Sequence, residues 1–299
     1  MRKIIEDNVD KLRGLCLTDL TELFNLSDVE VTGDFNCSKN YLTNLIGSPH
    51  TVGKNFDCSY NQLNSLAGAP KTVGGWFNCV DTNLTSLRGA PHTVGDHFDC
   101  DNNHLTSLEG SPHTISTDFS CQNNNLTSLK GSPHTVGVGF SCAFNNKLTS
   151  LKGGPHTVGG WFFCNNSRLT SLAGAPKTVG KTFNCCYNQL NSLAGAPKTV
   201  VGNFGCSDNN LTSLKGSPHT VGGFFDCHNN YLTSLEGSPH TVGKSFNCIN
   251  NNLTSLEGIP RTIGVNFFIS ETLKDKFPEE YIRSLSKIAG TVEYRYLPK

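Results

Sequence analysis

A cysteine returns every 21 residues through most of this chain, and that rhythm limits the fold more than any other feature. Eleven cysteines follow one another at intervals of 21 residues, with a single interval of 22, at positions 37, 58, 79, 100, 121, 142, 164, 185, 206, 227 and 248. The segment from Phe225 to Gly243, FDCHNNYLTSLEGSPHTVG, is a clean copy of the repeated text. A fixed short period overrides the two-domain expectation for 299 residues and predicts a solenoid of stacked coils.

The apolar residues of each repeat define which side of the coil faces inward. Phe and Cys stand two residues apart, so they point to the same side of a short strand. Two Leu and one Val complete the inward set, as Leu232, Leu235 and Val242 do after Cys227. Gly and Pro lie too close together in the G-x-P segment for a regular helix. We therefore expect about twelve short parallel strands in one curved sheet, with an extended or turn-rich convex side.

An asparagine follows each repeat cysteine by three residues in most coils. Its amide can satisfy backbone groups that leave the strand at that turn, so we interpret the column as structural. Its members are Asn40, Asn61, Asn103, Asn124, Asn188, Asn209, Asn230 and Asn251.

The segment from Phe35 to Phe268 resembles a leucine-rich repeat of the short bacterial-effector type, in which N-x-L-T-S-L precedes an extended stretch with Pro. It is also similar to uncharacterised leucine-rich-repeat proteins encoded by bacteriophages. The resemblance implies a β-solenoid-like leucine-rich repeat. The ubiquitin-ligase domain of some effector relatives has no room here, because few residues follow the last repeat.

The repeat text divides the chain into three parts. Residues 1–32 are expected to form a helical N-terminal cap, with Ile5, Val9 and Leu12 on one face. Residues 33–270 form the solenoid. Residues 271–299 are expected to form an α+β cap, with a helix opened by Pro278 and ended by Gly290 and then a strand from Thr291 to Tyr296. The apolar face of that helix would consist of Tyr281, Ile282, Leu285 and Ile288.

The thirteen cysteines invite a disulfide or a metal site, but their spacing suits neither. A column of cysteines one strand apart lacks the converging ligands of a zinc site and the distant pairs of a disulfide framework. Free, buried thiols favour a reducing compartment. No apolar run is long enough to cross a membrane and no secretory signal is present, so we expect a cytoplasmic protein. Cys186 is the exception and should lie on the exposed face.

Large side chains at outward strand positions are candidates for binding, because most coils carry small polar residues there. One group lies between residues 142 and 187, a second is centred on a tryptophan, and a third lies further along. These candidates are Phe144, Trp161, Phe163, Arg168, Cys186 and Tyr187, then Trp76, then Phe224 and His228. The alternative is that these aromatic residues only pack on one another across neighbouring strands.

Acidic residues occupy the same face, among them Asp99, Asp101 and Asp118. Acidic charge with aromatic anchors suits a protein partner with a basic patch. Solubility alone is the alternative explanation. Lys+Arg and Asp+Glu are equal at 24 each, which argues against nucleic-acid binding. No motif indicates a metal, a cofactor or a catalytic site.

These observations favour a non-enzymatic scaffold that binds a protein through its exposed sheet. The bacteriophage resemblance implies a host protein, such as one of antiviral defence, as the target that is bound and inhibited. Two alternatives stay open. One is a protein that sequesters a small ligand or nucleotide near Trp161 with Arg168 and Lys147, and the other is a virion or surface adhesin. The sequence does not indicate an oligomeric state.

Overall fold

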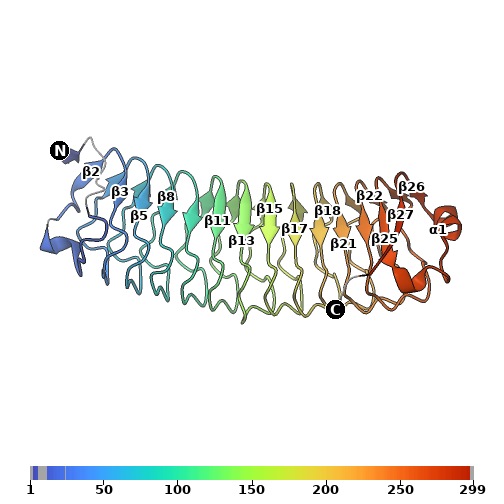
Figure 1. Cartoon of the computed structure of the whole chain (residues 1–299). Helices are drawn as coiled ribbons and strands as arrows, with labels where there is room; N and C mark the ends of the chain where they lie inside the picture. Colours follow the sequence, from blue (N-terminus) through green and yellow to red (C-terminus); the bar gives the residue numbers. More distant parts are fainter. Residues whose placement is uncertain (1–2, 6–11, 24, 297–299) are drawn as a thin grey trace. The chain divides into compact units, whose positions relative to one another are not determined.

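The computed structural model describes residues 3–5, 12–23 and 25–296. The chain divides into two compact units, Met1–Leu148 with Lys152–Pro155 and Thr149–Leu151 with His156–Lys299. Each unit is a parallel β-solenoid in which a coil contributes one strand to a larger sheet and one to a second ladder of short strands (Figure 1). The predicted parallel coils are confirmed, but the prediction of a single sheet is wrong because the Thr-Val pairs also form a ladder.

In the described part of the first unit, the larger sheet has the strands β3 (Phe35–Asn36), β5 (Phe56–Asp57), β7 (Phe77–Asn78), β9 (Phe98–Asp99), β11 (Asp118–Ser120) and β13 (Gly139–Ser141). The other strands of this described part lie in two ladders. One has β1 (Lys3–Ile5), β2 (Val29–Val31), β4 (Thr51–Val52), β6 (Thr72–Val73) and β8 (Thr93–Val94), and the other contains β10 (Thr114–Ile115) and β12 (Thr135–Val136).

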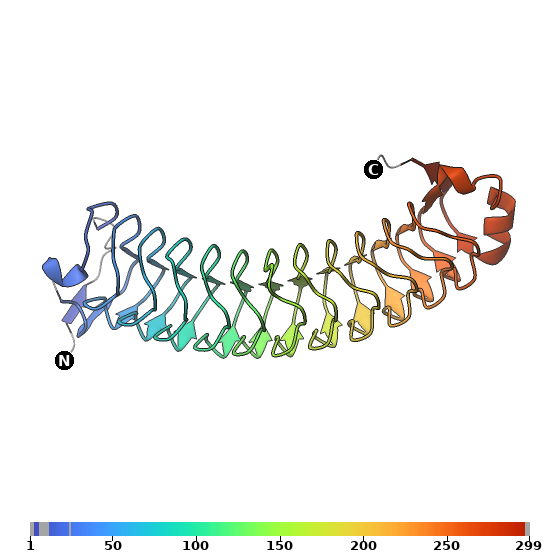
Figure 2. The ribbon, with the colours of Figure 1, turned by 90° about the horizontal axis from the view of Figure 1, so that it is seen from below.

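In the described part of the second unit, the larger sheet has β15 (Trp161–Phe163), β17 (Phe183–Asn184), β19 (Phe204–Gly205), β21 (Phe225–Asp226), β23 (Phe246–Asn247), β25 (Phe267–Ser270) and β27 (Val292–Arg295). The second ladder has β14 (Thr157–Val158), β16 (Thr178–Val179), β18 (Thr199–Val200), β20 (Thr220–Val221), β22 (Thr241–Val242), β24 (Thr262–Ile263) and β26 (Lys287–Ile288). Figure 2 shows the coils following one another within each unit.

The register places identical residues side by side, with Phe35 opposite Phe56 in one unit and Phe204 opposite Phe225 in the other. The Phe rings of adjacent coils stack with centroids 5.1–5.6 Å apart in the first unit. In the second unit the same distance is 5.1–5.8 Å. These rings are fully buried, which confirms the predicted inward side.

The eleven repeat cysteines are buried and none is in a disulfide. Several thiols donate a weak hydrogen bond to a carbonyl of the next strand, for example Cys100 Sγ to Ser120 O at 3.1 Å and Cys227 Sγ to Asn247 O at 3.1 Å. Burial raises the pKa of these thiols, Cys100 and Cys227 among them, far above the ordinary value. The repeat cysteines are therefore free and buried, as predicted, and their protonated thiols are unreactive.

The asparagine column is structural, as predicted. Asn61 Nδ2 donates to the carbonyls of Cys37 at 3.1 Å and Cys58 at 2.9 Å, and its Oδ1 accepts from the Leu42 amide at 3.0 Å. Each such amide thus joins two coils at the point where the strand ends. Asn145 makes equivalent contacts although it was not among the predicted members.

A glycine in each coil permits close stacking at the turn before Pro. Gly68 has φ +89°, and a Cβ there would lie 2.4 Å from backbone atoms of the previous coil at Leu45 and Ile46. Only glycine fits such a conformation and such an approach without strain.

The N-terminal part differs from the predicted helical cap. Lys3–Ile5 is strand β1, which pairs in parallel with Val29–Val31 and covers the edge of the second ladder. A 3-10 helix, η1 (Leu20–Glu22), follows with Asp19 as its N-cap. Val9, predicted on the same helical face as Ile5 and Leu12, lies outside the described residues.

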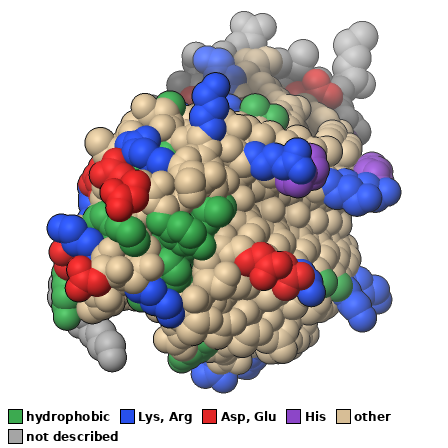
Figure 3. All heavy atoms as spheres, turned by 90° about the vertical axis from the view of Figure 1, so that its right-hand side faces the viewer, with side chains coloured by type: hydrophobic (Ala, Val, Ile, Leu, Met, Phe, Trp, Pro, Cys, Tyr) green, Lys and Arg blue, Asp and Glu red, His purple; other side chains and the backbone are tan. Residues whose placement is uncertain are grey.

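The C-terminal part contains the 3-10 helix η2 (Glu271–Leu273) and the helix α1 (Glu279–Leu285), whose N-cap is Pro278. The helix is shorter than predicted, because Lys287–Ile288 joins β24 as a strand instead of continuing it. Of its expected apolar face, Ile282 is buried while Tyr281 and Leu285 remain exposed. Apolar side chains gather on this end face among acidic and basic ones (Figure 3).

Candidate functional site

The larger sheet of each unit has a side that faces away from the Phe and Cys core, which we call the outer face. It consists of the residue before Phe, the residue between Phe and Cys, and the residue after Cys. The residue between Phe and Cys accepts a hydrogen bond from the amide two residues later, as Asp99 Oδ1 does from Asp101 N at 3.0 Å and Asn184 Oδ1 from Cys186 N at 3.0 Å. Asp and Asn are equivalent in this role, so part of the acidity of the outer face is structural.

The second residue after Cys bends the chain out of the sheet with a positive φ. Most coils carry Asn or Asp there, the residues that tolerate this conformation best. Tyr60, Phe144 and Tyr187 have φ 55°, 58° and 54° at that turn and expose 53%, 47% and 55% of their surface. A large exposed ring in a strained conformation favours a binding role over a packing role.

In the first unit, Trp76 is half-buried and stacks on His97 with ring centroids 5.9 Å apart. Its coil has Thr82 in place of the structural asparagine, and Thr82 Oγ1 donates to Cys79 O at 2.8 Å. The Thr82 hydroxyl therefore makes one of the hydrogen bonds that the asparagine amide makes in other coils. Phe144 also belongs to this unit, at an exposed turn.

Three half-buried aspartates stand on the outer face of the first unit, Asp99, Asp101 and Asp118. Burial and then the charge of Asp99 raise the pKa of Asp101 to about 6, although Ser120 Oγ at 2.6 Å and the Gln122 amide at 2.6 Å both donate to it. Burial also raises the pKa of Asp99. No described Lys or Arg pairs with Asp99 or Asp101, so an approaching cation would find poorly compensated negative charge.

In the second unit, Trp161 and Phe163 project from β15 to the same side and stack with centroids 4.7 Å apart. Both are half-buried, and Phe162 between them points into the core. Arg168 lies exposed directly after the bend at Asn166 and Ser167 of the same unit. The two outward rings thus form a rigid aromatic surface on the outer face.

Cys186 is half-buried on the outer face, and a Cβ at Gly205 would lie 2.8 Å from its Sγ. Burial raises the pKa of the Cys186 thiol to about 11. The thiol is therefore protonated near neutral pH and is a poor nucleophile.

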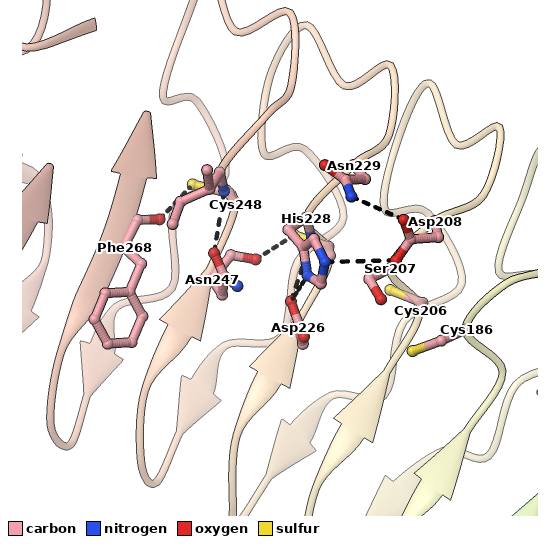
Figure 4. A network of polar contacts seen from close by, with 12 residues as sticks. Cys186, Cys206, Ser207, Asp208, Asp226, His228, Asn229, Asn247, Cys248 and Phe268 are labelled. Carbon is pink, nitrogen blue, oxygen red and sulfur yellow. Dashed lines mark hydrogen bonds and ion pairs between the residues drawn. The ribbon is translucent and has the colours of Figure 1, made fainter. Parts of the chain in front are cut away.

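A polar network lies further along the second unit, on the coils of β19 and β21 (Figure 4). His228 Nδ1 is 2.7 Å from Asp226 Oδ1, and His228 Nε2 is 3.4 Å from Asp208 Oδ2. The hydrogen bond with Asp226 raises the pKa of His228 in spite of burial. The charge of Asp208 also raises the pKa of the exposed Tyr187 phenol. The carboxylates of Asp208 and Asp226 therefore dominate the electrostatic potential around His228 and Tyr187.

A hollow of about 210 Å³ opens further along this outer face and is lined by Phe224, Ile249, Phe268 and Arg295 among others. Lys244 Nζ lies 5.5 Å from the Phe224 ring centroid, and the Arg295 guanidinium lies 4.2 Å from that of Phe268. Ile249 and Phe268 were not among the binding residues predicted from the sequence. Phe268 occupies the same place in its coil as Phe163, so the column of outward residues could have identified it.

In the second unit the candidates lie on three coils, with Trp161 and Phe163 on the coil of β15, Cys186 and Tyr187 on that of β17, and Phe224 and His228 on that of β21. The candidates Trp76, Asp99, Asp101, Asp118 and Phe144 belong to the first unit. Among the residues described, no group of three or more His, Cys, Asp or Glu could hold a metal ion.

Comparison with models of known protein families gives no match, and comparison with curated proteins gives none either. No helix within the described ranges is long and apolar enough to span a bilayer. The fold and the outer face therefore define the class of this protein as a parallel β-solenoid of stacked repeats.

Proposed function

We propose that this chain is a solenoid of the leucine-rich-repeat type that holds a protein partner against the outer face of its second unit, without catalysis. The observation that carries the proposal is the combination of the stacked pair Trp161 and Phe163 with the hollow beside Phe224. Half-buried aromatic rings that keep an exposed side are the usual anchors of protein interfaces.

The charges beside the Phe224 hollow, which Asp226 helps to line, indicate the chemistry of the partner. Asp208 and Asp226 flank His228, and Tyr187 stands exposed next to them. Carboxylates around aromatic anchors suit a partner surface rich in Lys or Arg, because such residues combine opposite charge with stacking on rings. On the resemblance to bacteriophage repeat proteins, the partner we propose is a basic protein of the host cell that is inhibited by being bound.

The experiment is capture of a partner from a lysate of the host cell by three forms of the immobilised full chain. These are the wild type, the double variant Trp161→Ala/Phe163→Ala, and the control Tyr41→Ala, which removes an exposed ring from the first unit. We expect one stoichiometric basic protein with the wild type and the control, and its loss with the double variant. Equal capture by the double variant would refute the proposal.

The stability of the double variant separates binding from folding. Trp161 and Phe163 lie on the outer face, so their removal should change the melting temperature little. Phe162→Ala, which removes the buried ring between them, should destabilise the fold by about 3–5 kcal/mol. A large loss of stability in the double variant would instead assign these rings to packing across strands.

A further inference from the structure

The larger sheet of the second unit ends at β27, which has one neighbour among the described strands, β25 (Figure 1). Phe267 N donates to Thr291 O at 3.0 Å, so the carbonyl of Thr291 points towards β25. Backbone groups alternate in direction along a strand, so those of Val292 and Tyr294 point away from β25. Within the described ranges no other group bonds to them. We call this open side the β27 edge. Such an edge is a template for a further strand.

The neighbouring edge of the same unit, at β26, is closed by a side chain. Ala289 N donates to Ile263 O at 3.0 Å, so Ile288 faces away from β24. Arg283 of α1 donates there, with Nη1 3.0 Å from Ile288 O and Nη2 2.8 Å from Gly290 O. The cap thus occupies the β26 edge and, in the part of the chain that the structure describes, leaves the β27 edge open.

The strand β27 is held from its inner side. Tyr294 lies opposite the buried Ile269, and its Oη donates to Phe277 O at 2.6 Å. Lys274 Nζ lies 5.6 Å from the centroid of the same ring. Val292 is buried as well. These contacts fix β27 in the extended conformation without using its edge, so a second strand would find the backbone already ordered.

The outward side chains of β27 carry opposite charges on either side of Tyr294. Glu293 Oε1 accepts from Asn266 Nδ2 at 2.7 Å, and Glu293 Oε2 accepts from Arg295 Nε at 2.9 Å. The Arg295 guanidinium also lies over the ring of Phe268. Side chains two residues apart point to the same side of a strand, so the carboxylate and the guanidinium form a short alternation of charge beside the β27 edge.

We propose that the β27 edge binds the β27 edge of a second copy of this chain as an antiparallel strand pair, with a two-fold axis at Tyr294. In this register Tyr294 lies opposite Tyr294, and Val292 lies opposite Tyr296. These are the residues whose backbone groups point outward, as hydrogen-bonded pairs require. Glu293 of each copy then faces Arg295 of the other in a non-hydrogen-bonded pair, with Cα atoms about 4.5 Å apart. Opposite charges meet at both places, which stabilises the pairing.

The alternation of charge selects this occupant. A parallel strand that sets Glu293 against Arg295 leaves the reverse pair unmade. A strand of another protein would need an acid and a base in the same alternation, which a second copy supplies by symmetry. The inference goes beyond the protein partner proposed above and does not depend on it.

The test is the mass of the full chain in solution, measured by sedimentation at several concentrations with no other protein present. The wild type should show a monomer–dimer equilibrium. Arg295→Glu turns both ion pairs of the dimer into pairs of acids, and Glu293→Arg turns both into pairs of bases. Each variant should therefore weaken self-association by at least about tenfold. An equimolar mixture of the two should associate again, because every acid then faces a base.

Lys181→Glu is the matched control, because it makes the same change of charge at an exposed residue of the second unit outside β27, and it should dimerise as the wild type does. The doubly reversed variant Glu293→Arg/Arg295→Glu keeps the alternation and should also dimerise. A wild type that stays monomeric at millimolar concentration would overturn the proposal. So would a dimer that neither charge reversal weakens, or a mixture that stays monomeric. Arg295 also lines the Phe224 hollow, but the samples contain no partner, so this result is separate from that of the capture experiment.

Discussion

The indole of Trp161 stacks on the ring of Phe163 with the planes 27° apart, two residues along the same strand. Side chains two apart on a strand point to the same side, and here the second ring supports the first. The exposed side of the tryptophan is therefore held in one orientation before a partner arrives. Such preorganisation reduces the entropy lost on binding.

The strained turn at Tyr187 allows binding and stability to be separated. Tyr187→Asn puts the residue best suited to positive φ at this turn, so we expect the free energy of unfolding to rise by about 1 kcal/mol. The same change removes an exposed ring from the turn that borders the outer face and should weaken partner capture. Calorimetry and capture on the same sample measure both effects.

The reverse substitution is the control for this prediction. Asn166 has φ 53° in the same unit, and Asn166→Tyr should lower stability by a similar amount without reducing capture. If Tyr187→Asn instead lowers the melting temperature, the ring contributes to packing, and the argument from strain is wrong.

Protonation of Asp101 should stabilise the first unit. Its pKa of about 6 lies above the ordinary value of a carboxyl group, so the folded protein binds this proton more tightly than the unfolded chain. The ionised group opposes folding above pH 6, and this opposition disappears as the pH falls through 6 towards 4. Asp101→Asn should therefore raise the melting temperature at pH 7.5 and have little effect at pH 4.5.

A matched pair of melting curves at those two pH values measures this difference. Oδ1 of an asparagine can still accept from Ser120 Oγ and from the Gln122 amide, so the variant keeps the main hydrogen bonds. An equal change at both pH values would show that the charge of Asp101 is not the cause.

His228 should have the opposite dependence on pH. Its pKa is raised, so the proton stabilises the folded state. This contribution is complete below the unfolded value near pH 6.5 and is lost as the pH rises through the folded pKa. We expect His228→Gln to lower the melting temperature at pH 6 and to have a much smaller effect at pH 9.

Asp208→Asn provides an independent check, because it removes one of the two carboxylates that face the imidazole. It should reduce the pH dependence of the wild type without abolishing it, since Asp226 remains hydrogen-bonded to His228. A pH profile that is identical in the wild type and in His228→Gln would rule out this ion-pair network as the source.

The inward half of every coil could be predicted from the sequence, because apolar residues recur at the spacing that places their side chains on the inner side of the coil. Phe225, Cys227, Leu232, Leu235 and Val242 are all fully buried, as their spacing requires. A structural role for the asparagine column could also be predicted, since the amides at a strand end must find partners.

The ladder of Thr-Val strands and the N-terminal strand could not be predicted in the same way. A strand of two residues is too short to show the alternation of apolar and polar residues that identifies a strand in a sequence. The pairing of Lys3–Ile5 with Val29–Val31 depends on where the N-terminal segment meets a sheet edge, which is a matter of tertiary structure. Ile288 continues a helical pattern in the sequence, but an unpaired edge at β24 favours a strand there.

The candidate site was predictable only in part. The outward direction of Trp161 and Phe163 follows from the position of Phe162, but the position of Arg295 over Phe268 depends on a strand outside the repeat. The hydrogen bonds from Asn250 to Asn229 and from Asn229 to Asp208 also need the positive φ at each turn, a conformation that Asn and Asp tolerate but do not impose.

The repetition of the Phe stack has a consequence for how such a chain can change. Each coil meets the next through the same ring, thiol and amide, so within a unit one coil is an acceptable neighbour for almost any other. Duplication or deletion of a whole 21-residue segment would alter the number of coils while leaving every interface between neighbours intact. A lineage, or an engineer, could therefore lengthen or shorten this protein without redesigning its interior.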